Sequence, residues 1–362
     1  MDPAAPRPMI GRGYSPAMLL SVLDQSPIRK NGTPAEAVAE TLALAAACDA
    51  LGFHRYWLAE HHNSQSFAGA SPEIVIGAVA AKTRTIRVGS GGVMLTHYSP
   101  LKVAEQFRML EALYPGRIDL GVGRAPGSDQ RTALALQAGP QAFGVDAFPS
   151  QVHLLRQFLD DASGAAALPE DHPYRGIRAM PTGDDSSGPE LWMLGSGLHS
   201  AVYAAEMGLA FSHAHFINPE GTEDAVAAYR DRFKPSPACP RPKLSLGVAA
   251  LAAESEERAQ DLARSRDLWV VRFLQGRPIA FPPPQEARDY PYTDEEMALL
   301  RAVRRRAIVG TPEKVRAALL SLAQSCGAEE LVIVTITYDF AARLRSYELL
   351  AEAFALSPRP RP

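Results

Sequence analysis

Short apolar runs alternate with helix-start signals along this chain. The runs are bounded by turn residues, as buried β-strands are, and they cover residues 19–23, 56–59, 86–95, 118–122, 191–194, 210–215, 244–252 and 331–337. Helix starts follow most of them, as at Thr33-Pro34-Ala35-Glu36, where Thr33 can cap the first turn and Glu36 can complete a capping box. Eight strands that alternate with helices predict a parallel α/β sheet, most simply closed as a (β/α)8 TIM barrel.

A doubly wound open sheet shows the same alternation and is the alternative fold. No Gly-x-Gly-x-x-Gly follows the first strand, which counts against its dinucleotide-binding form. We therefore expect one barrel domain over residues 17–356, between a disordered N-terminal tail at 1–16 and a C-terminal tail at 357–362. Irregular insertions are expected after strand four, at 125–149 and 161–189, and after strand seven, at the proline-rich segment 276–292.

Composition and charge argue against several classes of protein, among them nucleic-acid-binding and membrane proteins. The formal net charge of −3 gives no electrostatic reason for nucleic-acid binding. Cys48, Cys239 and Cys326 are far apart, which predicts reduced thiols in a cytoplasmic protein instead of a disulfide framework or zinc site. No apolar run reaches the roughly 18 residues of a membrane span, so we expect neither a membrane nor a nucleic-acid partner.

In TIM-barrel enzymes, the catalytic and binding residues lie at the carboxyl ends of the strands. Polar residues and glycines gather there in this chain, while the strand starts carry no comparable set. The candidates are Asp24, Gln25, Ser26, Glu60, His61, His62, Gly91, Gly92, Thr96, His97, Arg124, His213 and His215. Adjacent His61 and His62 should point in opposite directions, and no third residue completes a metal site. Of His213 and His215, we expect only one to face the barrel interior.

Several of these candidates also have purely structural interpretations. Arg124 could cap a helix or pair with a carboxylate, and Gly91-Gly92 could be a β-bulge that lets the barrel curve. Val103, Phe107 and Leu110 fall at helical spacing and could pack either on the barrel or on a second subunit.

A glycine-rich turn follows the fifth strand. Gly195, Ser196 and Gly197 break the strand, and His199 or Ser200 opens an alanine-rich helix that ends near Gly208. Such a turn points unpaired backbone N–H groups, serine hydroxyls and the positive end of the helix dipole at one place, which suits a phosphate. The glycines could equally serve only to make the turn tight.

Four motifs in this order resemble the bacterial luciferase-like flavin-dependent monooxygenases. They are Leu58-Ala59-Glu60-His61-His62, the strand from Val88 to Leu95, Ala104-Glu105-Gln106, and the stretch from Gly116 to Arg124. With Leu194-Gly195-Ser196-Gly197 added, the resemblance is closest to the FMN-type, MsnO8-like branch. It runs over about residues 19–355 and implies a (β/α)8 barrel with an insertion after strand seven.

The resemblance also implies roles for individual residues. Gly197 and Ser200, with Ser196 and His199 beside them, match the turn that holds the FMN phosphate, and Arg124 matches an arginine that reaches the same phosphate. Gly91-Gly92 matches a non-prolyl cis peptide against which the flavin ring packs. His61 matches the catalytic histidine near the flavin reaction centre.

The resemblance thus implies the oxygenase component of a two-component system. Reduced FMN from a separate flavin reductase and O2 as co-substrate would oxidise a small organic molecule, and many relatives are homodimers. One alternative is an F420-dependent hydride-transfer enzyme of the same fold. A non-catalytic flavin-binding protein is another, and a metal-dependent barrel hydrolase is a more distant one.

Overall fold

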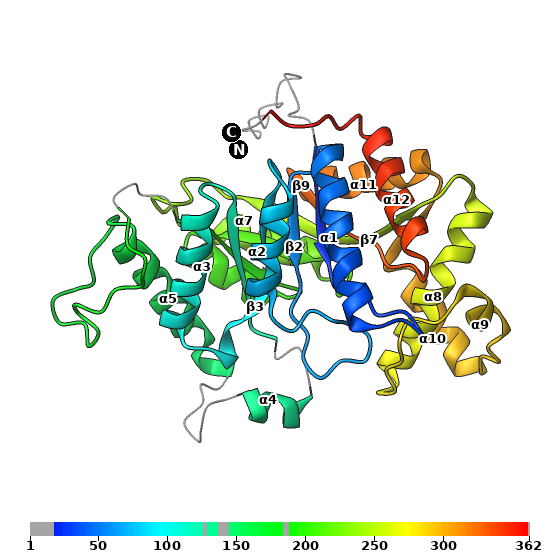
Figure 1. Ribbon diagram of the computed structural model, residues 1–362, viewed down its shortest axis with the longest axis horizontal. Helices are drawn as coiled ribbons and strands as arrows, with labels where there is room; N and C mark the ends of the chain where they lie inside the picture. Colours follow the sequence, from blue (N-terminus) through cyan, green and yellow to red (C-terminus); the bar gives the residue numbers. More distant parts are fainter. Residues whose placement is uncertain (1–17, 126–128, 137–144, 184–187, 361–362) are drawn as a thin grey trace, which may run out of the picture.

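Eight parallel strands close into a barrel that helices surround (Figure 1). The structure is a computed structural model that describes residues 18–125, 129–136, 145–183 and 188–360, so the expected tail at 1–16 lies outside the described residues. β1 pairs with β2 and β9, and β7 pairs with both β6 and β9, which closes the ring. The predicted (β/α)8 barrel is confirmed; its strands are β1 Leu19–Asp24, β2 Arg55–Leu58, β3 Arg87–Met94, β4 Ile118–Gly123, β5 Glu190–Gly195, β6 Ala210–Ala214, β7 Leu244–Ala252 and β9 Glu330–Val334.

The outer helices begin largely where the sequence signals predict. Thr33 accepts a hydrogen bond from the backbone N–H of Glu36, and the Glu36 carboxylate accepts one from the backbone N–H of Thr33, which completes the capping box. The surrounding helices are α1 Pro34–Leu51, α2 Pro72–Lys82, α3 Pro100–Leu113, α5 Phe148–Ala162, α6 Leu198–Glu206, α7 Thr222–Arg232, α8 Glu256–Leu274, α11 Pro312–Cys326 and α12 Phe340–Ala353; a short 3₁₀ helix, η1, spans Leu95–His97.

The expected irregular segments contain some regular structure. After β4, the helix α4 Gln130–Leu136 and the 3₁₀ helix η2 Val145–Ala147 fall inside the stretch expected to be irregular, although 126–128 and 137–144 lie outside the described residues. After β7, α9 Pro284–Asp289 corrects the prediction that 276–292 holds no regular structure. Its proline sits in the first helical turn, where a missing N–H costs no hydrogen bond.

A ninth strand, β8 Ala307–Gly310, was not predicted. It follows α10 Asp294–Arg304 and pairs in parallel with the second half of β7, from Ala249 to Ala252. The first half of β7 belongs to the barrel, whereas the second half extends beyond it and gives β8 an edge to pair with. This pairing, and not a local pattern in four residues, makes the segment a strand.

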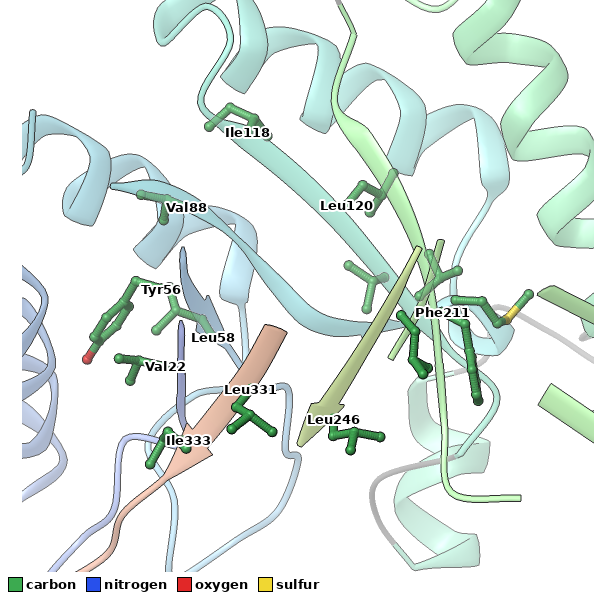
Figure 2. Close-up of a cluster of buried hydrophobic side chains, with 14 of the residues drawn as sticks. Val22, Tyr56, Leu58, Val88, Ile118, Leu120, Phe211, Leu246, Leu331 and Ile333 are labelled. Atoms are coloured by element: carbon green, nitrogen blue, oxygen red, sulfur yellow. The ribbon is translucent and has the colours of Figure 1, made fainter. Parts of the chain in front are cut away.

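Side chains alternate between two apolar layers along each strand. On β2, Tyr56 and Leu58 face outward and join the core between the strands and the helices, part of which Figure 2 shows. Trp57, between them, faces inward and belongs to a second cluster inside the barrel with Trp192 and Val332. The indole rings of Trp57 and Trp192 meet edge to face at 5.3 Å, so the middle of the barrel is a packed core.

A buried ion network fills the barrel where the strands begin. The guanidinium group of Arg55 lies 2.8 Å from Asp119, 2.9 Å from Glu190 and 3.0 Å from Glu330. Arg55, Asp119 and Glu330 are each at most 3% exposed. The expectation that polar residues do not gather at the strand starts is therefore wrong. Residues 55, 119, 190 and 330 are far apart in the sequence, and only closure of the barrel brings these charges together.

The remaining global features concern membranes and thiols. None of the described helices is both long and apolar enough to cross a lipid bilayer. Cys48, Cys239 and Cys326 are buried free thiols. Burial raises the pKa of Cys239 above its usual range, which disfavours the reactive thiolate.

Candidate active site

A cavity of about 380 Å³ opens at the carboxyl ends of the strands. Side chains and backbone from β1 to β6 and from the loops that follow them form its wall. The eight residues to which the sequence assigned catalysis or cofactor binding all lie in this wall: His61, Gly91, Gly92, Arg124, Ser196, Gly197, His199 and Ser200. The structure therefore brings together residues that are spread over 140 positions of the chain.

The turn between β5 and α6 presents free backbone donors to this cavity. Helix α6 begins at Leu198, one or two residues before the predicted start, and its N-cap, Gly197, has no side chain to accept from the first turn. The side-chain amide of Asn218 donates to the backbone carbonyl of Ser196 at 2.8 Å and fixes the turn from outside. An uncapped helix start of this kind binds anions through its N–H groups and dipole.

Arg124 follows the last residue of β4 and is half-buried in the cavity wall. Within the described part of the chain, no carboxylate lies within ion-pair distance of it, so the structure does not bear out the alternative in which Arg124 pairs with a carboxylate. A half-buried guanidinium that lacks an internal partner fits a phosphate, which it can bind with two parallel hydrogen bonds. Together with the α6 turn, it makes this end of the cavity suitable for a phosphate group.

Gly91 and Gly92 are joined by a cis peptide bond, as predicted. The β3–β4 register also shifts between Ser90 and Val93, so the bulge interpretation holds at the same place. A Cβ atom on Gly91 would lie 2.5 Å from a methyl carbon of Leu23, and one on Gly92 would lie 2.7 Å from the carbonyl oxygen of Gly121. Neither position has room for a side chain, so bare backbone forms this part of the cavity wall.

The two adjacent histidines point to different surroundings, as predicted. His61 lines the cavity, and its Nδ1 atom is buried with no hydrogen-bond partner among the described residues. Burial, with a smaller contribution from the neighbouring His62, lowers the pKa of His61 to about 4, so the ring is neutral near pH 7. An unsatisfied buried nitrogen in a cavity wall fits a site whose bound molecule completes the hydrogen bonding.

His62 instead does not line the cavity and belongs to a hydrogen-bonded group around the Glu60 carboxylate. Its Nε2 atom lies 2.7 Å from a carboxylate oxygen of Glu60, and the hydroxyl of Tyr98 donates to the same oxygen at 2.6 Å. The second carboxylate oxygen of Glu60 accepts from the backbone N–H of Met94 at 3.0 Å. His62 therefore satisfies a buried carboxylate, whereas His61 is left for the cavity.

Asp24, Ser26, His213 and His215, like His62, do not line the cavity. Asp24 faces outward and pairs with Arg343 of α12 at 2.7 Å. His213 and His215 bond to the backbone carbonyl of Asn218 and to the hydroxyl of Thr222. The expectation that one of these two histidines faces the interior is wrong, because residues two apart share a face of a strand and the inward face belongs to Ser212 and Ala214.

Sequence reasoning missed other contributors to the site. Ser212 and Ile217 line the cavity, and Asn218 fixes the turn between β5 and α6 from outside. The alternation along β6 could have indicated Ser212, but nothing local marks Asn218 as the partner of Ser196, 22 positions away. Over the residues that the structure describes, no cluster of three His, Cys, Asp or Glu side chains could hold a metal ion.

Comparison with known proteins shows the family to which the chain belongs. The sequence profile of luciferase-like monooxygenases matches residues 18–330. The chain belongs to the luciferase-like monooxygenase family. The N-acetyl-S-alkylcysteine monooxygenase of Bacillus subtilis (strain 168) is 37% identical over 341 residues, which cover 94% of this chain and 99% of the relative.

Solved structures agree with the family assignment. The crystal structure of apo-MsnO8 is 40% identical, covers 94% of this chain and all of the other, and has a TM-score of 0.85. The oxygenating constituent of 3,6-diketocamphane monooxygenase from Pseudomonas putida, solved in complex with FMN, is 18% identical over 96% of this chain and 99% of that one, with a TM-score of 0.68, and shares the fold. An F420-dependent secondary alcohol dehydrogenase shares it at 14% identity and TM-score 0.67, over 95% and 99% of the two chains.

Proposed function

We propose that this luciferase-like monooxygenase is the oxygenase component of a two-component system. It would take reduced FMN from a separate flavin reductase and use O2 to oxidise a small organic substrate. The observation that carries the proposal is the convergence of two features on one end of the cavity. They are Arg124, which has no ion pair among the described residues, and the uncapped start of α6. That end suits a phosphate dianion, and His61 lies in the same cavity wall.

The chain's own residues would bind and orient the cofactor. Arg124, the hydroxyls of Ser196 and Ser200 and the first N–H groups of α6 would hold the phosphate, with His199 beside them. The bare backbone of Gly91-Gly92 would let the flat flavin ring approach closely. When bound, reduced FMN supplies two electrons; with two more from the substrate, these reduce O2 to one transferred oxygen atom and one water. A neutral His61 accepts a proton at one ring nitrogen and donates at the other.

Two rival functions use the same cavity. An F420-dependent enzyme would transfer hydride and need no O2, and a flavin-binding protein would bind FMN without turnover. The neutral, unsatisfied imidazole of His61 favours a catalytic site over simple storage. Oxidation of a substrate under strict exclusion of O2 would favour the F420-dependent enzyme.

We also propose that the protein is a homodimer. Val103, Phe107 and Leu110 pack on the barrel and are buried within one chain, so they are not free to bind a partner. The neighbouring helices α2 and α3 do expose other apolar side chains, which a partner could cover. They are Ile74 on α2 and Met109 and Leu113 on α3. Ile74→Asp should shift the mass measured by light scattering from dimer to monomer, whereas Ile177→Asp, on a loop, should leave the dimer intact.

Anaerobic titration with reduced FMN, oxidised FMN and riboflavin tests the phosphate assignment. Arg124→Ala should weaken binding of reduced FMN by about 2 kcal/mol, the worth of a hydrogen bond to a charged group. It should leave riboflavin, which has no phosphate, bound as before. Arg131→Ala removes an exposed arginine of α4 that does not line the cavity and serves as the matched control.

Two outcomes would contradict this part of the proposal. An equal loss of FMN and riboflavin affinity in Arg124→Ala would show that the arginine does not bind the phosphate. Failure of the wild-type protein to bind FMN in either redox state would remove the FMN assignment altogether, and F420 would be titrated next.

Oxygen transfer is tested separately with ¹⁸O2 and reduced FMN. The substrate panel would begin with N-acetyl-S-alkylcysteines, because one relative of this chain is a monooxygenase of these compounds. One ¹⁸O atom per product molecule is expected from the wild type. Oxidised product without ¹⁸O would contradict a monooxygenase reaction.

A further inference from the structure

An aromatic stack holds the ring of His61, which forms no side-chain hydrogen bond with the part of the chain that the structure describes. The imidazole lies nearly parallel to the ring of Phe67, with centroids 4.4 Å apart and 25° between the planes. The backbone N–H of His61 donates to the carbonyl of Gly69 at 2.8 Å, but its Nδ1 atom has no partner among the described residues. The orientation of the imidazole in the cavity wall therefore depends on where Phe67 lies.

Phe67 is itself held by residues about 200 positions away. Its ring meets Trp269 of α8 at 5.3 Å and Phe281, in the segment after α8, at 5.6 Å. Trp269 and Phe281 also contact each other, with ring centroids 4.9 Å apart. None of the three side chains is more than 9% exposed, so Phe67 has little freedom to change its position.

Hydrogen bonds fix the backbone around these rings. The indole N–H of Trp269 donates to the hydroxyl of Ser66 at 2.8 Å, and this hydroxyl donates to the carbonyl of Ile279 at 2.9 Å. The backbone of Phe281 exchanges two hydrogen bonds with the loop after β1, to Ile28 at 3.0 Å and from Lys30 at 2.7 Å. The insertion after β7 is thereby joined to the loop that carries His61.

We propose that Phe67, Trp269 and Phe281 form an aromatic buttress that positions His61 for the reaction, with Trp269 and Phe281 acting through Phe67. The proposal rests on the proposed function of His61. It assigns the insertion after β7 a role at the site, although neither Trp269 nor Phe281 lines the cavity. The three residues are positioning residues, because none of them reaches the cavity contents except through the imidazole.

The buttress also affects the charge state of the imidazole. It covers one face of the ring with uncharged side chains, in keeping with the lowering of the His61 pKa to about 4 by burial. The other ionisable groups nearby are His62, Glu60, which is hydrogen-bonded to His62, and Arg124 and His199 in the cavity wall. Removing the buttress should therefore raise the pKa of His61 toward 6.5.

NMR of the full-length protein labelled at histidine tests this without turnover, with the His61 resonance assigned from His61→Gln. Phe67→Leu should shift the His61 resonance and raise its pKa, and it should leave the affinity for reduced FMN unchanged. It should also lower kcat by about tenfold to a hundredfold, the scale on which small misplacements of a reacting group act. Phe67→Tyr keeps the stack and should restore wild-type behaviour, and Trp269→Phe should give a smaller change of the same sign.

Phe53→Leu is the matched control. Phe53 is equally buried and meets Tyr347 edge to face at 5.7 Å, in the core outside the barrel. It should destabilise the protein without moving the His61 resonance. An unchanged resonance and pKa in both Phe67→Leu and Trp269→Phe would overturn the proposal. If these change but His61→Gln retains full turnover, the positioning stands and the proposed catalytic role of His61 fails.

Discussion

Gly195 and Ser200 are in a contact that only glycine permits. A Cβ atom on Gly195 would lie 2.3 Å from both the Cβ and the Oγ atoms of Ser200. This close approach folds the end of β5 against the first turn of α6 and aims the helix start at the cavity. The tightness of the turn and its suitability for a phosphate are therefore two aspects of one geometry.

Gly195→Ala should displace Ser200 and the start of α6. Overpacking of this kind costs about 1–3 kcal/mol, so we expect affinity for reduced FMN to fall about tenfold or more and the melting temperature to drop. Gly197→Ala is the matched control, since its Cβ would meet no atom within 4 Å and its φ of −147° suits any residue. Its melting temperature should equal that of the wild type, and an equal drop in both variants would contradict this account of the turn.

His61 should make the protein less stable in acid. Its pKa is about 4 in the folded protein against 6.5 for an ordinary histidine, so between these values the unfolded chain binds more protons. Stability is then lost as the pH falls from 6.5 to 4, by up to about 3 kcal/mol. His61→Gln should remove this part of the pH dependence in urea unfolding at pH 7, 5.5 and 4.5. His153→Gln, at an exposed histidine of α5, gives the baseline, and parallel pH profiles for the two variants would refute the assignment.

We expect His62 to contribute to the stability of the fold, whereas the role proposed for His61 is in the reaction. His62→Ala removes the 2.7 Å partner of the Glu60 carboxylate and should cost about 1–3 kcal/mol, as expected for a buried polar group left partly unsatisfied. His62→Gln keeps a donor and should recover part of the loss. Urea unfolding at pH 7 measures both, and full stability of His62→Ala would show that Tyr98 and Met94 satisfy Glu60 without it.

Asp119 should be one of the most sensitive positions for stability. It accepts from Arg55 at 2.8 Å, from Arg87 at 2.6 Å and from the indole of Trp57 at 2.9 Å. Asp119→Ala leaves Arg55 buried with one partner fewer and should cost about 3–5 kcal/mol in urea unfolding. Glu329→Ala breaks an exposed pair with Arg241 and should cost less than about 1 kcal/mol. Similar losses in the two variants would mean that the network at the strand starts does little for stability.

The sequence by itself determined the features that depend on neighbouring residues. Thr33 and Glu36 are three positions apart, so a capping box there needs no distant partner. The alternation of apolar runs with helices likewise predicted the barrel, and closure of the barrel brings the ends of consecutive strands to one face. For this reason the residues nominated at strand ends, such as His61, Arg124 and Ser200, line a common cavity.

The tertiary structure decided the features that depend on distant partners. Arg55 and Glu330 are 275 positions apart, and Trp269 lies 203 positions from Ser66, so no local pattern could show that they meet. β8 is a strand only because β7 extends beyond the barrel and offers it an edge. Local signals specify which element a segment forms. Closure of the barrel and docking of the β7 insertion specify which charges neutralise one another and which rings hold His61.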